Sequence, residues 1–210
     1  MKSLLSLKGL AIIDWVAARL ERSALLDEIV FALPDTPLDD VLAAHLRNRG
    51  RHVERGPEAD VLRRFALAAA AANAGAIVRV CADNPLIDGG CVDELIDFYR
   101  REKPDYAYNH IPADNLWPDG LGAEIVSRDL LDEIDQKASS PAQREHALNY
   151  LWDNADSYRI ATFDPADPAL RRPDLKLDVD SPEDFARLAL APISVKSSPG
   201  ELVGIFPQKR

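Results

Sequence analysis

Two aspartates, each at the end of an apolar run, are the residues best suited to chemistry in this chain. Asp83 follows the run at 77–82, and Asp180 follows the run at 175–179. Each precedes a turn that contains proline. Ligands of open α/β sheets bind at the carboxyl ends of strands, so the two carboxylates are expected to face one crevice. Carboxylate oxygens are ligands that Mg²⁺ prefers. The pair therefore predicts a magnesium site that holds the phosphates of a nucleotide.

Each of these aspartates also has a structural interpretation. Aspartate commonly hydrogen-bonds its own backbone ahead of a proline turn, and for either residue taken alone this role is somewhat more frequent than catalysis. The coincidence of two strand ends at one crevice favours the functional interpretation. Three further aspartates are better explained structurally: Asp88 starts the following helix, Asp184 lies in a first turn favoured by the helix dipole, and Asp178 is solvated.

Arg79 is unusual because it lies in the middle of an apolar run. Strand alternation places it on the same face as Cys81 and Asp83. A buried guanidinium needs an anionic partner. A protein carboxylate and a ligand phosphate are the two open alternatives for that partner.

A second group of polar residues lies on the helix with the clearest start. Ser140 is the expected N-cap, Pro141 the first helical residue, and Gln143 completes a capping box. A solvated helix start tolerates charged side chains, so this interpretation and a ligand-contacting role are about equally supported. The residues concerned are Arg144, Glu145 and His146.

The elements that must position these residues alternate between helix and strand, which is typical of an α/β fold. Strands are expected at 28–33, 52–56, 77–83, 105–109, 122–126, 158–163 and 175–179. Helices are expected at 10–22, 60–73, 92–102, 127–137 and 140–154, with a last one after Ser181. Residues 1–192 are expected to form one domain and residues 193–210 a mobile C-terminal tail.

Composition excludes several classes of protein. The 210 residues are 47% hydrophobic and 29% charged, as in a single enzyme-sized domain. A net charge of −10 disfavours non-specific binding to nucleic acid or to an anionic membrane. The two cysteines are expected to be reduced structural thiols. Lys8 and Asp14 interrupt the opening apolar run, and no stretch reaches membrane-spanning length, so a cytoplasmic location is expected.

Several segments between residues 2 and 190 form one ordered pattern. They are residues 7–16, 27–30, 55–65, the run that ends at Asp83, residues 118–124, residues 144–146 and the run around Asp180. In this order and combination they resemble the cytidylyltransferases of the spore-coat polysaccharide SpsF type, which are relatives of the acylneuraminate and Kdo cytidylyltransferases. No single segment is as specific as the combination.

The resemblance implies an α/β, Rossmann-like nucleotidyltransferase fold of three layers with a mixed, mostly parallel sheet. It also implies a reaction in which a sugar oxygen attacks the α-phosphorus of CTP and pyrophosphate leaves. Asp83 and Asp180 would then hold Mg²⁺, which suits a transfer that needs mainly positioning and neutralisation of charge. The implied partners are CTP and a small sugar, and a homodimer is left open.

The resemblance implies roles for eight further residues. The nucleotide or phosphate contacts would be Lys2, Arg64 and Arg79. The sugar-pocket residues would be Asn109, Glu124, Arg144, Glu145 and His146.

The chain departs from the family pattern in two places. Family members begin with a strand and a glycine- and arginine-rich phosphate loop that ends in Leu-Pro-x-Lys, whereas this chain starts at that lysine, Lys2. The loop would supply backbone N–H donors to the CTP phosphates, and the strand would lie inside the sheet. Gly122 also replaces an aspartate of the family motif Asp-Gly-Leu-Asp-x-Glu.

Three interpretations follow from these departures. The chain is part of a longer, functional cytidylyltransferase, or it is a non-catalytic relative that binds a nucleotide or sugar or serves as a partner subunit. In the third, only the fold is shared and the chemistry is glycosyl transfer. The motif at residues 180–184 argues against the third interpretation.

Overall fold

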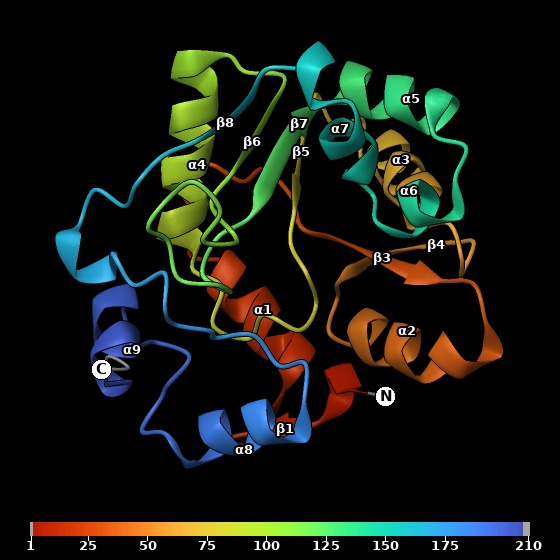
Figure 1. The fold of residues 1–210 in the computed structure, drawn as a ribbon. Coiled ribbons are helices and arrows are strands. Elements are labelled where there is room, and N and C mark those ends of the chain that lie inside the picture. The colour runs from red at the N-terminus through yellow and green to blue at the C-terminus, as the bar shows by residue number, and fades with distance from the viewer. Residues whose placement is uncertain (1, 208–210) are drawn as a thin grey trace.

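A computed structural model of the protein describes residues 2–207, in which helices and strands alternate along the chain (Figure 1). The strands are β1 (Ser6–Leu7), β2 (Leu10–Ala11), β3 (Val30–Pro34), β4 (His52–Gly56), β5 (Ala76–Arg79), β6 (Tyr106–Tyr108), β7 (Glu124–Ser127) and β8 (Ile160–Thr162). The α-helices are α1 (Ile12–Leu20), α2 (Asp40–Arg47), α3 (Val61–Ala71), α4 (Gly89–Glu102), α5 (Arg128–Lys137), α6 (Pro141–Glu145), α7 (Asn149–Asp153), α8 (Pro182–Leu190) and α9 (Pro199–Ile205). Short 3₁₀ helices lie at Lys2–Leu4, Pro37–Asp39, Ala155–Ser157 and Pro168–Leu170.

The strands of residues 2–207 form three separate sheets. β1 and β2 pair antiparallel, β3 and β4 pair parallel, and the largest sheet has the order β5-β7-β6-β8. In that sheet β7 is antiparallel to both β5 and β6, while β6 is parallel to β8. The described strands are therefore mixed, as expected, but the expected excess of parallel pairs is not found in the four-stranded sheet.

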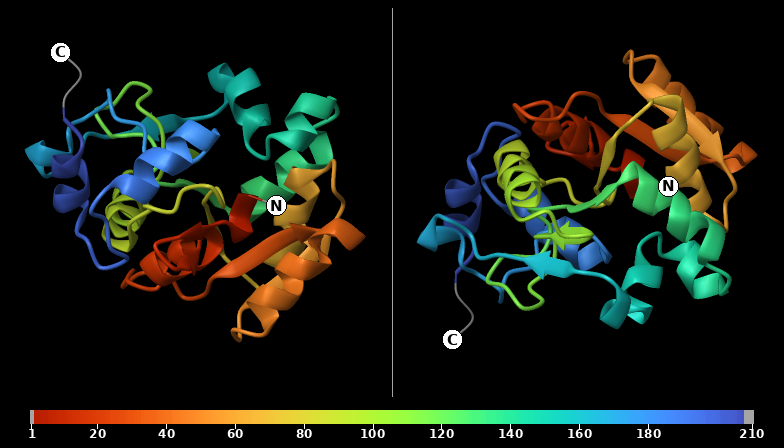
Figure 2. Two further views of the ribbon diagram at one scale, coloured as in Figure 1. Left: turned by 90° about the horizontal axis from the view of Figure 1, so that it is seen from below. Right: turned by 90° about the horizontal axis from the view of Figure 1, so that it is seen from above.

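Helices cover both faces of the four-stranded sheet (Figure 2). Tyr106 and Val126 pack with residues of α3, α5 and α7. Ala107 and Ile125, their neighbours along the same strands, pack on the other face with residues of α1 and α4. Because successive strand residues point to opposite faces, this alternation builds a layer of helices on each side of the sheet.

Local capping chemistry explains where most helices begin. The Oγ of Ser127 accepts the Leu130 N–H at 3.1 Å, and Ser140 and Ser181 form complete capping boxes. Asp88 is the N-cap of α4, as predicted, and accepts the Gly90 N–H at 2.9 Å. Among the described residues, no helix is long and apolar enough to cross a membrane.

The structure corrects three expected elements. The helix expected at 140–154 is broken, because α6 ends at Glu145 and α7 begins at Asn149, with Ala147 and Leu148 buried between them. The strand expected at 175–179 is irregular backbone with a single bridge from Asp119 to Lys176.

The third correction concerns the expected tail. In residues 193–207, a Ser198 capping box starts α9, and Leu202 and Val203 are buried. The buried Arg19 side chain donates to the carbonyl oxygens of Val195 and Ser197, both at 2.9 Å. This segment is therefore packed against the core, and residues 208–210 lie outside the described part.

Candidate functional site

Asp83 and Asp180, far apart in the sequence, are brought together in the structure. The Val179 N–H donates to the Asp83 carbonyl oxygen at 2.9 Å, which fixes the two segments side by side. Lys2 Nζ lies 3.0 Å from Asp83 Oδ2 and 3.8 Å from Asp180 Oδ1. Both carboxylates thus lie beside the same ammonium group, that of Lys2, at the sheet edge that the chain reaches after β5.

A second lysine gathers three carboxylates beside this pair. Lys176 Nζ lies 2.8 Å from Asp180 Oδ2, 3.4 Å from Asp184 Oδ2 and 3.6 Å from Asp178 Oδ1. The hydrogen bond to Asp180 raises the pKa of Lys176, and the same bond lowers the pKa of Asp180. We call Asp83, Asp119, Asp178, Asp180 and Asp184 the acidic cluster.

Asp178 belongs to this cluster, and its expected role as a solvated side chain is wrong. The residue is 9% exposed, and its Oδ1 has no hydrogen-bond partner within residues 2–207. Burial, followed by the negative charge of Asp119, raises the pKa of Asp178 to about 7. No local signal in the sequence marked Asp178, because the loop that carries Asp119 and Gly120 packs against its backbone.

Asp119 reaches the cluster from the loop before β7. Its N–H donates to the Leu175 carbonyl and its carbonyl accepts the Leu177 N–H, both at 2.9 Å. Gly120 follows with φ +94°, and a Cβ there would lie 2.8 Å from the Asp178 nitrogen. A glycine is needed for this close approach. Burial, opposed by Lys176 and reinforced by neighbouring carboxylates, raises the pKa of Asp119.

The donor chemistry of this edge suits a hard divalent cation. Carboxylate oxygens from Asp83 and Asp180 already lie around one positive charge, the Lys2 ammonium. Among residues 2–207 no three His, Cys, Asp or Glu side chains are already arranged as a metal site. A cation between Asp83 and Asp180 would therefore take the place of the Lys2 ammonium.

Arg79 lies in a buried polar network. Its guanidinium pairs with Glu124, whose side chain is 5% exposed and also accepts the Tyr106 hydroxyl at 2.6 Å. His110 Nε2 is 3.9 Å from Glu124. Burial is the largest single influence on Glu124 and opposes its ionisation, but Arg79, His110 and the Tyr106 hydroxyl together outweigh burial and lower the pKa of Glu124. The anionic partner of Arg79 in the structure is therefore a protein carboxylate.

Asn109 is fully buried and holds backbone groups. Its Nδ2 donates to the Cys91 carbonyl at 2.9 Å, and its Oδ1 accepts the Ala123 N–H at 2.8 Å. A Cβ at Gly122 would overlap both the carbonyl oxygen and Oδ1 of Asn109. The side chain expected in a sugar pocket thus faces backbone, and it leaves no space for a side chain at position 122, where the family motif has an aspartate.

The remaining candidates lie on α3 and α6. Arg64 donates to the carbonyl oxygens of Pro57 at 2.8 Å and Glu58 at 2.9 Å. Arg144 binds Asp60 Oδ2 at 2.6 Å and Asp135 Oδ1 at 2.7 Å. Glu145 and His146 are exposed. In the described part of the chain, these arginine contacts tie α3 to its neighbours and do not reach the acidic cluster.

Comparison with known proteins adds an independent line of argument. Residues 1–187 match the family model for cytidylyltransferases. The chain is 31% identical over 179 residues to the spore coat polysaccharide biosynthesis protein SpsF of Bacillus subtilis (strain 168), covering 83% of this chain and 72% of that protein.

Solved structures show the same fold. A cytidylyltransferase from Leptospira borgpetersenii serovar Hardjo-bovis (strain JB197) superposes with a TM-score of 0.85 at 25% identity, covering 97% of this chain and 86% of that one. CMP:2-keto-3-deoxy-manno-octonic acid synthetase in complex with CTP gives 0.65 at 17% identity, covering 90% of both chains. This chain is therefore a member of the cytidylyltransferase family.

Proposed function

We propose that this chain transfers CMP from CTP to a sugar hydroxyl and releases pyrophosphate. The observation that supports this most directly is the meeting of Asp83 and Asp180 around one cation. In the reaction the sugar oxygen forms a bond to the α-phosphorus. The bond from that phosphorus to the bridging oxygen breaks, pyrophosphate leaves with the electron pair, and the proton of the sugar hydroxyl passes to solvent.

Asp83 and Asp180 would hold Mg²⁺, which when bound neutralises charge on the triphosphate and on the leaving group. Asp119 and Asp184 of the acidic cluster add further carboxylates at this edge, which favours a divalent cation over the single charge of Lys2. The side chains of Lys2 and Lys176 are 40% and 44% exposed. Both ammonium groups therefore have room to exchange a carboxylate partner for a phosphate oxygen.

A carbohydrate acceptor is supported by the relative named for spore coat polysaccharide biosynthesis. Glu145 and His146 keep their proposed role as sugar contacts, because both are exposed on or beside α6. Arg64 and Arg79 keep the proposed phosphate role only if their present carbonyl and carboxylate partners are exchanged on binding.

The test is release of pyrophosphate from CTP and Mg²⁺ across a panel of sugars and sugar acids. Asp83→Asn and Asp180→Asn are each expected to lower turnover by about two orders of magnitude or more, because the cation loses a charged ligand. Asp97→Asn, an exposed change on α4, is the matched control and is expected to leave turnover unchanged.

Near-normal turnover in both cluster variants would contradict the metal assignment. CTP binding without pyrophosphate release for any acceptor would favour a non-catalytic nucleotide-binding subunit instead.

A further inference from the structure

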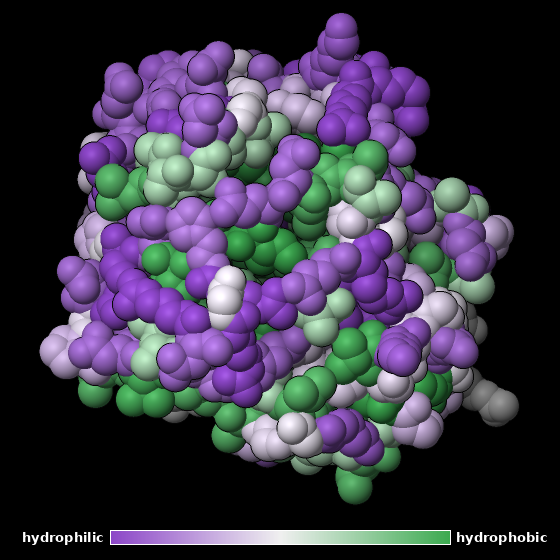
Figure 3. Space-filling model, turned by 180° about the vertical axis from the view of Figure 1, so that it is seen from behind, coloured by the Kyte–Doolittle hydropathy of each residue, from purple (hydrophilic) through white to green (hydrophobic). Residues whose placement is uncertain are grey.

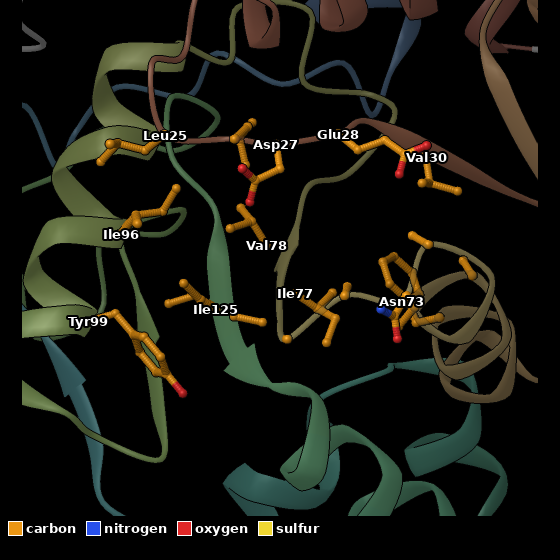
Figure 4. A pocket seen from close by; sticks show the side chains of 18 of the residues that line it. Leu25, Asp27, Glu28, Val30, Asn73, Ile77, Val78, Ile96, Tyr99 and Ile125 are labelled. Atoms are coloured by element: carbon orange, nitrogen blue, oxygen red, sulfur yellow. The ribbon is translucent and has the colours of Figure 1, made fainter.

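A cavity of about 500 Å³ lies between β3 and β5 (Figure 4). Most of the residues that line it are apolar, among them Leu25, Ile77 and Ile125. Hydrophobic residues also form the floor of a hollow with a hydrophilic rim on the face opposite to that of Figure 1 (Figure 3). A sugar buried among apolar side chains would leave its hydroxyl groups without hydrogen-bond partners, which is unfavourable. A carbohydrate is therefore expected to bind where an aromatic ring and polar side chains lie together.

Trp152 on α7 is the tryptophan that solvent reaches. It is 36% exposed, whereas Trp15 and Trp117 are 1% and 0% exposed. Its surroundings on the surface are polar, because Asp153 follows it and α6 lies beside α7. Gln143 of α6 donates to Asp153 at 2.8 Å and fixes this arrangement. Helix α7 therefore presents an aromatic ring within a polar surface.

The ring of Trp152 is held by two tyrosines of β6. Its plane lies at 80° to that of Tyr106, with ring centroids 5.7 Å apart, and at 62° to that of Tyr108, with centroids 5.1 Å apart. The indole N–H also hydrogen-bonds the Tyr106 hydroxyl, which in turn donates to Glu124 at 2.6 Å. Glu124 is itself paired with Arg79. Because the ring is already fixed, little side-chain freedom is lost when a ligand stacks on it.

Trp152 lies toward the sheet edge that carries the acidic cluster. β5 and β6 are both antiparallel to β7, so their carboxyl ends lie at one edge, and Tyr108 is the last residue of β6. The next contact along this edge joins Tyr108 to the ring of His110, with centroids 5.9 Å apart. The His110 carbonyl oxygen accepts the N–H of Gly120 at 3.2 Å, and Gly120 follows Asp119 of the acidic cluster. A contiguous row of residues therefore links Trp152 to the acidic cluster.

A pyranose ring has the chemistry that matches this surface. Each of its faces carries C–H groups that pack on the π-face of a tryptophan, while its hydroxyl groups point outward and need hydrogen-bond partners. Polar partners are present on or beside α6, where Glu145 and His146 are exposed. An acyclic polyol offers similar hydroxyl groups without a flat apolar face, so it gains little from the tryptophan.

We propose that Trp152 is the platform on which the pyranose ring of the acceptor lies, an inference that rests on the proposed transfer of CMP to a sugar. Stacking orients the ring, and hydrogen bonds at its edge fix which hydroxyl group faces the acidic cluster. The acceptor class is therefore a pyranose, and acyclic polyols are expected to be poor acceptors.

Steady-state kinetics with the acceptor found in the pyrophosphate assay gives the first test. Trp152→Ala is expected to raise the KM for the acceptor by about tenfold or more and to leave the KM for CTP unchanged, because stacking concerns the sugar alone. Trp152→Phe keeps an aromatic face and the fold, so it should raise the acceptor KM by about threefold or less. Leu38→Ala removes another exposed hydrophobic side chain and is the matched control, which should change neither constant. Equal acceptor KM values for Trp152→Ala and the unchanged chain would overturn the proposal.

Quenching of tryptophan fluorescence by acrylamide tests the platform without turnover. Because Trp15 and Trp117 are buried, the quenching reports on Trp152. With CMP and Mg²⁺ present, glucose, N-acetylglucosamine and 2-keto-3-deoxy-manno-octonic acid are compared with the acyclic control sorbitol. At least one of the three pyranoses is expected to lower the quenching constant by about twofold or more, and sorbitol to leave it unchanged. Equal quenching with all four compounds would contradict the platform.

The two tests separate this proposal from the transferase activity. Protection of Trp152 by a pyranose without pyrophosphate release would support the platform and contradict the proposed transfer. Pyrophosphate release with unchanged quenching, and with an unchanged acceptor KM in Trp152→Ala, would support the transfer and overturn the platform.

Discussion

Single charges decide what the acidic cluster can hold. Asp83 and Asp180 were recognisable in the sequence because each follows an apolar run and precedes a proline turn, which are local signals. Asp178 was misjudged because its burial comes from the loop of Asp119 and Gly120, which the sequence does not place nearby. Asp178, which contributes to the charge of the acidic cluster, is therefore recognisable as a member of it only from the tertiary structure.

Glu124 is expected to be costly to neutralise. Glu124→Gln should lower the free energy of unfolding by about 3 kcal/mol, because it leaves the Arg79 guanidinium without its carboxylate in a largely buried network. Chemical denaturation with tryptophan fluorescence measures the change. Arg79→Met combined with Glu124→Gln should recover part of the loss. A double variant as unstable as the sum of the two single variants would show that the pair is not coupled.

Gly122 is expected to be indispensable for packing. Gly122→Ala should destabilise the fold by about 2 kcal/mol or more, because its Cβ overlaps Asn109. Gly204→Ala is the control, since it meets open space within α9 and should stabilise by about 0.5–1 kcal/mol through helix propensity. Thermal unfolding of both variants measures the difference. Equal Tm values would contradict the predicted overlap between a Cβ at position 122 and Asn109.

At the level of secondary-structure elements, the sequence located the starts of helices better than their ends or the pairing of strands. The structure confirms the predicted Ser140 cap, and the helices expected at 127–137 and after Ser181 begin at serine caps as well. The break after α6 has no glycine or proline to announce it, because it follows from the burial of Ala147 and Leu148 in the core. The order β5-β7-β6-β8 likewise depends on contacts between distant segments.

Helix α9 is expected to contribute to stability like any core element. Leu202→Ala should lower the free energy of unfolding by about 2–4 kcal/mol, since the side chain is fully buried. Leu190→Ala removes a side chain that is 86% exposed and should have almost no effect. Similar urea midpoints for the two variants would restore the original expectation of a loose tail.

His52 couples β4 to the segment before β3 in a pH-dependent way. Hydrogen bonds to Glu28 and then to Glu54 raise its pKa above 6.5. Because the pKa of His52 is higher in the folded state, its contribution to folding stability is complete at pH values below the pKa of the unfolded state. The contribution is lost as the pH rises through the pKa of the folded state. His52→Gln should therefore reduce the difference in stability between about pH 6 and pH 8. An NMR titration in which His52 has an ordinary or lowered pKa would contradict this.

On the scale of the whole molecule, the acidic cluster gathers carboxylates from distant parts of the chain at one edge, beyond the end of β5. The sequence predicted the α/β class and the meeting of two carboxylates. The net charge of −10 means that a triphosphate approaches this surface favourably only with cations.

Calorimetric titration of CTP into the 210-residue chain, with Mg²⁺ and then with EDTA, tests the central claim most directly. We expect binding that requires Mg²⁺ and that weakens by about tenfold or more in Asp180→Asn, because that variant removes one of the two carboxylates proposed to hold the cation. CTP binding of equal strength without Mg²⁺ or in Asp180→Asn would contradict the assignment of Asp83 and Asp180 to a metal-dependent nucleotide site.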